Sequence, residues 1–375
     1  MCMDLEKARE EIKEADKGIA KLFVRRMRAV EDVAAYKKEH GLPVYDAAQE
    51  RRVIERNCEY IEDDIIRDYY TRFLENTMAL SRAYQSRLLE GMKTAYTGVE
   101  GAFAHIASKR IFPDTNLVSY ASFEDSYDAV VRGECDAAVL PIENSYAGEV
   151  GPVLDLMYSG SLCVNGVYEL PVTQNLLVKK GAALSDIKRV ISHPQALSQC
   201  DEYIKKNRFR TETESNTALA AKKVAESDDI TVAAIASAET AELYGLEVLA
   251  ENINESAVNT TKFAVFARSK SAPNYKRDNK FILVFTTKHT AGALSRAISV
   301  IGEAGFNMVS IHSRPVKETP WQYYFYIEAE GDESSEAGKK MIKELDGVCE
   351  RLKVVGHYAA DINIKDGIGK NEDKN

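Results

Sequence analysis

The chain of 375 residues lacks several features that define common protein classes. Its six cysteines include no CxxC pair, and its six histidines show no HExxH or other metal-ligand spacing. These patterns predict neither a disulfide framework nor a metal site. No apolar run approaches the roughly 18 residues of a membrane span, and the first residues, MCMDLEKARE, lack the apolar stretch of a signal peptide. We therefore expect a cytoplasmic protein with reduced thiols.

Positive charge is also scarce. The chain has 49 Lys and Arg against 58 Asp and Glu, a net charge of −9, and no segment offers the basic surface that nucleic acids require. Neither a nucleic acid nor a membrane is an expected partner. A hydrophobic content of 45% and a charged content of 29% are typical of globular proteins, and the length predicts two or three domains.

Residues 1–92 form a first region that is poor in helix breakers. Apolar residues recur at three- and four-residue steps over residues 4–39, which is typical of one long helix. HGLPVYD ends this helix, Asp46 suits the N-cap of a second helix to about residue 60, and a third helix is predicted over 64–89. At about 1.5 Å per residue the first helix is too long for so small a unit to bury. We therefore expect intertwined dimerisation.

Two basic residues interrupt the apolar stripe of the first helix. Lys37 follows Arg26 by eleven residues. That spacing is nearly three turns, so the two share a face about 16 Å apart. They could grip the two ends of a small dianion, or both could extend along a solvated edge. Asp46 could likewise be only a cap, and Ser81 with Gln85 only an exposed i,i+4 pair.

Seven positions in this region together resemble the all-helical chorismate mutase family: Arg9, Arg26, Lys37, Asp46, Glu50, Ser81 and Gln85. The resemblance implies that Arg9 and Arg26 bind substrate carboxylates. It also implies that Lys37 and Gln85 hydrogen-bond the ether oxygen as its bond breaks, and that Glu50 holds the ring hydroxyl.

The chemistry of that family suits these residue types. A Claisen rearrangement needs no nucleophile, only a compact conformer and positive density where negative charge develops. Arg9 lies about 25 Å along the helix from Arg26, too far for one ligand, so we expect it to act in the site of a partner chain. Gln49 departs from the family, which commonly has arginine there.

From residue 94 short apolar strands alternate with helical stretches. This alternation predicts mainly parallel sheets, with ligand sites beyond the carboxyl ends of the strands. Pro194 suits a first helical position and Asn216 an N-cap, so several helix amino termini could direct free N–H groups into one anion-binding cleft. The informative segments are YTGVEGAF at 96–103, VLPIENSYAGEV at 139–150, ISHPQAL at 191–197 and NTTKF at 259–263. The first is not a phosphate-binding loop, and no cofactor is expected.

These four segments, in this order, resemble the prephenate dehydratase family. The resemblance implies two α/β lobes of periplasmic-binding-protein-like fold over residues 94–268, with the site between them. It places Thr261 at the family's catalytic threonine, and it implies a substrate site at Asn144, Ser145, Ser192, Gln195, Thr217, Lys262 and Phe263.

The implied reaction removes carbon dioxide and the ring hydroxyl from prephenate and yields phenylpyruvate. Because aromatisation drives it, the protein mainly has to seat the carboxylates and hold a hydrogen-bond donor beside the hydroxyl. Lys262 departs from the arginine of the family. It could bind a substrate carboxylate, or it could be a salt-bridged strand residue.

A polar linker, SKSAPNYKRDN, precedes residues 280–360, whose predicted order βαββαβ is ferredoxin-like. This unit resembles an ACT regulatory domain of the phenylalanine-binding kind, although His312 replaces the usual glutamate. The resemblance implies an effector site at Gly292, Ala293, Leu294, Asn307, Ser313 and Arg314. These motifs could otherwise be only a helix start and a strand end. Residues 365–375 are predicted to be a disordered tail.

The resemblances together imply a multidomain enzyme of phenylalanine biosynthesis. We expect it to convert chorismate to prephenate and prephenate to phenylpyruvate, without a cofactor and under feedback inhibition by phenylalanine. A homodimer or larger homo-oligomer is expected. Two alternatives stay open: a mutase fused to an arogenate dehydratase, and a non-catalytic amino-acid sensor, since two-lobed clefts and ACT units can merely bind ligands.

Overall fold

The structure is a computed structural model that describes residues 5–256, 258–270, 278–359 and 362–364. Most of the predicted linker and the whole predicted tail, 365–375, lie outside the described residues. The chain divides into two compact units, Met1–Met92 and Lys93–Asn375, and each is described by itself. In the described part of the chain, no helix is both long and apolar enough to cross a membrane.

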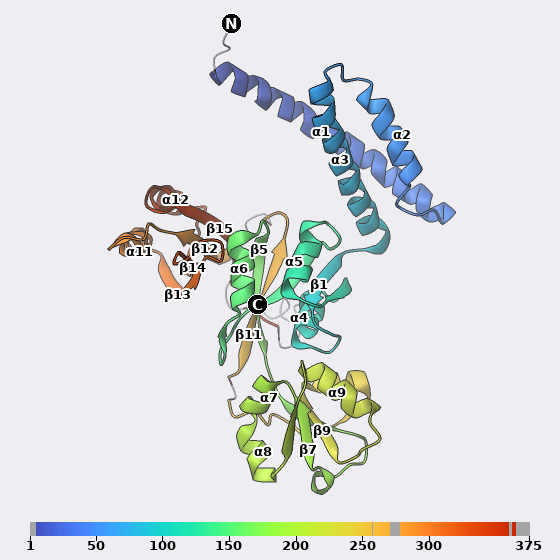
Figure 1. Ribbon diagram of the computed structural model, residues 1–375, viewed down its shortest axis with the longest axis vertical. Coiled ribbons are helices and arrows are strands. Elements are labelled where there is room, and N and C mark those ends of the chain that lie inside the picture. The colour runs from blue at the N-terminus through green and yellow to red at the C-terminus, as the bar shows by residue number, and fades with distance from the viewer. Residues whose placement is uncertain (1–4, 257, 271–277, 360–361, 365–375) are drawn as a thin grey trace, which may run out of the picture. The chain divides into compact units, whose positions relative to one another are not determined.

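The first unit is a set of three helices, as predicted. They are α1 (Leu5–His40), α2 (Ala47–Cys58) and α3 (Asp64–Glu90). Figure 1 shows that α3 crosses α1, and Val30, Ala34 and Met78 are buried there. The small number of buried apolar residues fits the expectation that these helices cannot cover one another alone.

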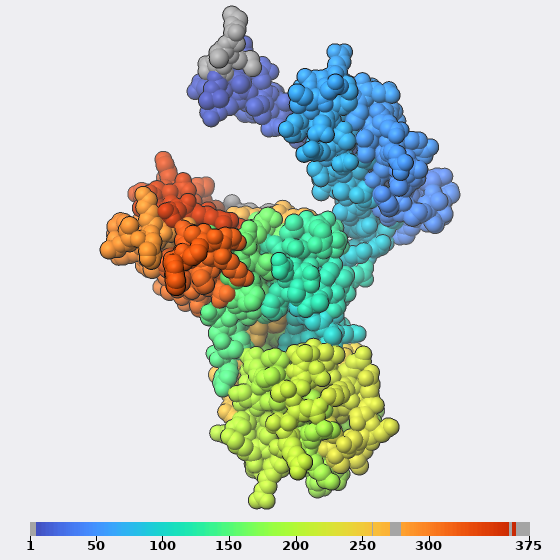
Figure 2. Space-filling model, in the orientation of Figure 1, coloured from blue at the N-terminus to red at the C-terminus, as the bar shows by residue number. Residues whose placement is uncertain are grey.

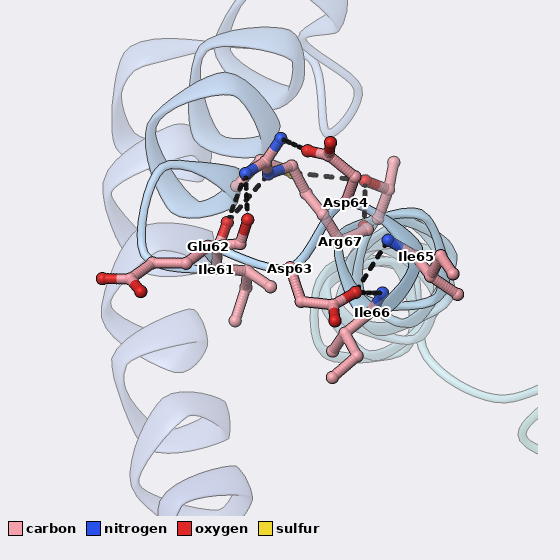
Figure 3. A network of polar contacts seen from close by, with 9 residues as sticks. Ile61, Glu62, Asp63, Asp64, Ile65, Ile66 and Arg67 are labelled. Carbon is pink, nitrogen blue, oxygen red and sulfur yellow. Dashed lines mark hydrogen bonds and ion pairs between the residues drawn. The ribbon is translucent and has the colours of Figure 1, made fainter.

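Aspartate caps start the second and third helices. Asp46 Oδ1 accepts a hydrogen bond from Gln49 N at 2.9 Å, so the predicted cap is confirmed. Asp63 Oδ1 accepts from the N–H groups of Ile65 and Ile66, each at 2.9 Å. Figure 3 shows Arg67 closing the same turn, where its guanidinium donates to the carbonyls of Ile61 and Glu62. The turn between α2 and α3 is therefore fixed by local polar contacts.

The amino-terminal half of α1 has an apolar stripe that its own unit leaves exposed. Leu5, Ile12 and Leu22 are 62%, 61% and 64% exposed, and Ile19 is 49% exposed. Figure 2 shows this part of the helix (dark blue) standing clear of α2 and α3. An apolar stripe of this length is typical of a face that packs against another helix.

The second unit begins with an α/β lobe, here called lobe 1. Its strands share one mixed sheet and its helices cover the faces of that sheet (Figure 1). The strands are β1 (Lys93–Thr97), β2 (Asn116–Tyr120), β3 (Ala137–Asn144), β4 (Gly148–Glu149), β5 (Cys163–Pro171) and β11 (Thr260–Ala267). The helices are α4 (Phe103–Ile111), α5 (Phe123–Val131) and α6 (Gly151–Ser159).

Lobe 2 is built around a five-stranded sheet in the order β10-β6-β9-β7-β8. The strands are β6 (Asn175–Val178), β7 (Arg189–Ser192), β8 (Arg210–Thr213), β9 (Val232–Ala236) and β10 (Glu247–Ala250). The helices are η1 (Leu184–Asp186), α7 (Pro194–Gln199), α8 (Asp201–Asn207), α9 (Thr217–Glu226) and α10 (Ala238–Tyr244).

Two crossings join the lobes, one at residues 172–174 and one that includes the described residues 251–256 and 258–259. They are hydrogen-bonded to each other, because Val172 N donates to Asn259 O and Ile253 N donates to Gln174 O, both at 2.8 Å. The return of the chain through lobe 2 brings β11 back between β3 and β5, and it pairs with both in antiparallel sense. The prediction of mainly parallel sheets is therefore wrong in part: among the described residues of the lobes, only β1–β2, β1–β3, β7–β8 and β7–β9 make parallel pairs.

The carboxy-terminal part has the predicted βαββαβ order. Its elements are β12 (Asp278–Thr286), α11 (Ala293–Glu303), β13 (Asn307–Pro315), β14 (Tyr323–Glu330), α12 (Glu336–Val348) and β15 (Arg351–Ala359), followed by β16 (Ile362–Asn363). Its sheet is continuous with that of lobe 1, since Gly356 of β15 pairs with Val164 of β5. A Cβ atom on Gly356 would lie 1.9 Å from Val164 O, so glycine is required for this approach.

The same junction contains a shared hydrophobic core. Ile282, Val284 and Tyr326 of the carboxy-terminal part pack in one cluster with Leu140 and Phe266 of lobe 1. Lobe 2 has separate clusters around its own sheet. The carboxy-terminal part is therefore attached to one lobe by both backbone pairing and side-chain burial.

Candidate active sites

A cavity of about 830 Å³ lies between the two lobes of the second unit. Lobe 1 contributes Thr97, Phe103, Tyr120, Asn144 and Phe263 to it, among others. Lobe 2 contributes His193, Gln195, Gln199, Asn216 and Thr217, and the crossings contribute Val172 and Gln174. All four predicted segments thus contribute lining residues to the cavity, and NTTKF does so through Thr261 and Phe263.

Thr261 and Asn144 form the polar centre of this cavity. Asn144 Nδ2 donates to Thr261 Oγ1 at 2.9 Å and to Asn259 Oδ1 at 2.9 Å. Asn144 Oδ1 accepts from the N–H groups of Tyr146 and Ala147 at 3.0 and 2.9 Å, which fixes the orientation of the amide. The Thr261 oxygen is therefore an acceptor toward Asn144, and its own O–H is left to donate to a ligand.

The described residues that line the cavity have no charged side chains. None of them is Asp, Glu, Lys or Arg. Positive potential comes instead from backbone N–H groups, because α4 and α9 both begin at the cavity, at Phe103 and at Thr217. Asn216 caps α9, accepting from Leu219 N at 2.8 Å. The arrangement suits an organic anion held by neutral donors.

His193 also lines the cavity, and the sequence did not single it out. Its Nδ1 accepts from Gln195 N at 3.3 Å, and burial lowers the pKa of the ring. A neutral ring with Nδ1 as acceptor has its proton on Nε2. Its place between Ser192 and Pro194 in the segment ISHPQAL was the only signal that could have found it.

Three residues predicted for the substrate site lie outside the cavity lining. Ser145 Oγ donates to Val258 O and accepts from Thr260 N, each at 3.0 Å, and so joins the two strand ends. Ser192 is fully buried and donates to Ile235 O at 2.6 Å, which braces β7 on β9. These two side chains stabilise the strands that carry the site.

Lys262 is the third residue outside the cavity. Its ammonium lies 2.9 Å from Glu143 Oε2 and 3.5 Å from Glu328 Oε2. Burial alone would lower the pKa of Lys262, but the carboxylates of Glu328 and Glu143 raise it overall. Neighbouring residues of a strand point to opposite faces, so Thr261 and Lys262 cannot both face the substrate. Of the two alternatives for Lys262, the structure therefore fits the salt-bridged strand residue.

In the first unit the structure brings Arg26, Ser81 and Gln85 together between α1 and α3. The Arg26 guanidinium donates to Ser81 Oγ, and partial burial lowers the pKa of Arg26. Gln85 Nε2 donates to Ser81 O at 3.3 Å, while Gln85 Oε1 is buried without a partner among the described residues. Ser81 and Gln85 are 4% and 6% exposed, so the alternative that they are only an exposed i,i+4 pair is wrong.

The other predicted mutase residues are held at separate places. Lys37 Nζ donates to Val44 O at 2.6 Å, so it turns toward the loop before α2. Glu50 is paired with Arg82 of α3, a contact that the sequence did not predict. Arg9 lies on the exposed first turns of α1. One copy of this unit therefore leaves Arg9 remote from Arg26, as the helix length predicted.

The predicted effector residues lie at the start of α11 and on β13. Gly292, in the left-handed conformation, is the N-cap of α11, whose first residue is Ala293, and Asn307 donates to Glu330 at 2.8 Å. Ser313 is exposed, whereas the neighbouring Arg314 faces α6 of lobe 1. The two residues therefore point in opposite directions from β13.

Arg314 takes part in a contact between the carboxy-terminal part and lobe 1. Its Nε donates to Asp155 Oδ1 at 2.9 Å, where Tyr324 Oη also donates at 2.8 Å, and Lys317 lies 3.1 Å from Oδ2. Burial alone would raise the pKa of Asp155, but these donors lower it overall, so the carboxylate stays ionised. A Cβ on Gly151 would lie 2.1 Å from Arg314 Nη1, so this close approach uses a glycine.

Comparison with known proteins assigns both units. Residues 8–86 match the family Chorismate mutase type II, and residues 94–271 match Prephenate dehydratase. A bifunctional chorismate mutase/prephenate dehydratase of Enterobacter agglomerans is 30% identical over 94% of this chain and 95% of its own length. An arogenate dehydratase/prephenate dehydratase of Arabidopsis thaliana is 33% identical over 73% of this chain and 74% of its own.

A solved structure is also similar. A prephenate dehydratase of Arthrobacter aurescens in complex with L-Phe has a TM-score of 0.67 at 28% identity, over 72% of this chain and 90% of that one. Both catalytic regions are thus present, and the non-catalytic sensor is not supported. The protein is an enzyme of aromatic amino acid biosynthesis that converts chorismate to prephenate and prephenate to phenylpyruvate. The chain belongs to the family of bifunctional chorismate mutase/prephenate dehydratases.

Proposed function

We propose that the interlobe cavity binds prephenate with its ring hydroxyl beside Thr261. The Asn144–Thr261 hydrogen bond is the observation that carries this assignment, because it leaves the threonine O–H free to donate. A hydroxyl that accepts a hydrogen bond becomes a better donor itself. Gln195, Thr217, His193 and the N–H groups at the start of α9 seat the carboxylates.

The reaction needs little acid strength from the protein. The carbon–carboxylate bond breaks, its electron pair enters the ring, and carbon dioxide leaves. The ring expels the hydroxyl together with the electron pair of the carbon–oxygen bond. One proton converts this hydroxyl to water, and the group that gave the proton regains one from solvent. Thr261 donates to the departing oxygen as negative charge develops on it, which lowers the barrier most where that charge is largest.

For the mutase reaction we propose that Arg26 and Lys37 provide positive density around chorismate, with Gln85 completing the site. Arg26 is half-buried, and Gln85 has a buried oxygen without a partner among the described residues, so both have polar atoms for a ligand between α1 and α3. Glu50 is oriented by Arg82 and would receive the ring hydroxyl. Asp46 contributes by capping α2.

Arg9 and the exposed stripe of α1 support a second copy of this chain as partner. Leu5, Ile12 and Leu22 share the half of α1 that carries Arg9. Burying that stripe against a partner's helices would carry Arg9 into the partner's mutase site. The site is then completed only in the dimer.

We propose that residues 280–360 form an ACT domain that senses phenylalanine. Its βαββαβ order, and the similarity to a prephenate dehydratase solved with L-Phe, support this role. The Arg314–Asp155 contact offers a route to the dehydratase site. Asp155 lies on α6, which begins at Gly151 directly after the cavity-lining Val150. An effector that draws Arg314 away would release this end of α6.

An arogenate dehydratase is the second candidate, because relatives of that name are 33% and 32% identical to the chain. Arogenate carries an ammonium where prephenate carries a keto group. No residue that lines the cavity has a carboxylate to pair with an ammonium. The lining therefore favours prephenate.

The two activities should separate by single substitutions. We expect Lys37→Ala to lower the mutase kcat at least about 100-fold with dehydratase activity kept, because it removes positive charge at the breaking ether bond. Thr261→Val should do the reverse to a similar extent. Each activity is assayed with its own substrate, so each variant is its own folding control. Loss of both activities in one variant, or of neither, would contradict these roles.

Asn144→Asp should be more damaging to the dehydratase than its size suggests. An ionised carboxylate can only accept hydrogen bonds, so it would accept the Thr261 O–H hydrogen bond that the substrate needs. Its negative charge would also repel a dianion. We expect kcat for prephenate to fall about 100-fold or more. Steady-state kinetics measure this, with mutase activity as the control. Ser145→Ala changes the adjacent residue, which lies outside the cavity, and should retain far more activity. An equal loss in both variants would refute the idea that Asn144→Asp acts by reversing the direction of its hydrogen bond with Thr261.

Substrate preference follows from the uncharged lining. Purified enzyme should show a higher kcat/KM for prephenate than for arogenate, by about tenfold or more. Parallel assays of phenylpyruvate and phenylalanine formation decide this. Equal or higher efficiency with arogenate would favour the second candidate.

Effector control should depend on the Arg314–Asp155 pair. We expect Arg314→Gln, Asp155→Asn and the double variant each to raise the half-inhibitory concentration of phenylalanine by a similar factor of at least three, because each breaks the same contact. Lys340→Gln, which changes an exposed cation of α12, is the control and should leave inhibition unaltered. Unchanged inhibition in Arg314→Gln would remove this residue from the regulatory route.

A further inference from the structure

Gln174 combines burial with an unused hydrogen-bonding atom at the dehydratase cavity. The side chain is 2% exposed, and its Oε1 has no hydrogen-bond partner among the described residues. It lines the cavity that Thr261 and Asn144 also line. A buried acceptor without a donor is unfavourable, so such an atom on a residue that lines a ligand cavity points to a donor on the ligand.

The backbone holds Gln174 firmly in place. Its carbonyl accepts from Ile253 N at 2.8 Å, and its N–H donates to Asn254 Oδ1 at 3.0 Å. Both partners belong to the second crossing, which continues through Asn259 into β11 and Thr261. Gln174 and Thr261 are therefore positioned by the same pair of hydrogen-bonded crossings. The backbone from which the Gln174 side chain extends is fixed in place.

The chemistry of the substrate identifies the donor. Near neutral pH, prephenate has two ionised carboxylates and a keto group, which can only accept hydrogen bonds. Its ring hydroxyl is its one O–H donor. We propose that Gln174 Oε1 accepts a hydrogen bond from this hydroxyl and so orients the leaving oxygen toward Thr261. This inference rests on the proposed function of the cavity.

The contact would act by orientation during the reaction. As the carbon–oxygen bond breaks, the departing oxygen keeps its own hydrogen and takes up a second one from Thr261, whose proton is replaced from solvent. The hydrogen bond to Gln174 holds this oxygen toward the Thr261 hydroxyl while that transfer takes place. Its loss should misalign the leaving oxygen and so lower kcat more than it raises KM.

Gln174→Met keeps the length of the side chain and removes the carbonyl. We expect the kcat for prephenate to fall about 10- to 100-fold, with KM changed less than about threefold. Gln174→Glu keeps an acceptor but adds charge, so it should raise KM for the dianion while keeping most of kcat. Gln199→Met removes another buried glutamine of the same cavity and should affect kcat less.

Product inhibition separates this role from a structural one. Phenylpyruvate lacks the ring hydroxyl, so its inhibition constant should stay within about twofold in Gln174→Met, and mutase activity should be unchanged. An unaltered kcat in Gln174→Met, an equal kcat loss in Gln174→Glu, or a parallel loss of phenylpyruvate binding would overturn the inference. If both Gln174→Met and Thr261→Val leave prephenate turnover intact, the proposed function itself fails. If Thr261→Val loses prephenate turnover and Gln174→Met keeps it, only the role of Gln174 is refuted.

Discussion

On the proposed function, the cavity between the two lobes must hold a dianion although the described residues that line it have no charged side chain. Neutral donors can do this only if they are fixed in advance, because each one is weaker than a guanidinium and must not have to reorganise. Hydrogen bonds fix each of these groups: Leu219 N donates to the Asn216 cap of α9, Tyr146 N donates to the Asn144 amide, and that amide donates to the Thr261 hydroxyl. Catalytic power would then depend on the rigidity of the strands and caps that present these groups.

The crossings between the lobes provide much of that rigidity. They bond to each other through Val172, Ile253 and Gln174, and they lead directly into the strand that carries Thr261. A cavity assembled at a two-stranded connection can change width when the lobes move, while the groups at its base keep their spacing. Closure around prephenate would then exclude water without disturbing the Asn144–Thr261 pair.

The sequence predicted the parts of this protein that depend on local patterns. Helical periodicity located α1, α2 and α3, and the Asp46 cap followed from residue type alone. Pairing between distant strands was less accessible, because nothing local says that β11 returns between β3 and β5. The position of Lys262 was predictable in principle, since strand alternation separates it from Thr261. The proposed role of Gln174 was not, because this residue lies in a crossing without a motif and the proposal rests on its burial and on an oxygen without a partner among the described residues.

The two proposed sites solve the same electrostatic problem differently, and the attachment of the carboxy-terminal part fits this difference. In the proposed mutase site, Arg26 and Lys37 bring full charges on long side chains, which tolerate small displacements. The proposed dehydratase site relies on short neutral groups, so a small shift of one lobe is enough to misplace them. The carboxy-terminal part shares its sheet and core with lobe 1 and contacts α6 through Arg314, next to the cavity-lining loop. If this part senses phenylalanine as proposed, its signal would act on the reaction that is most sensitive to position.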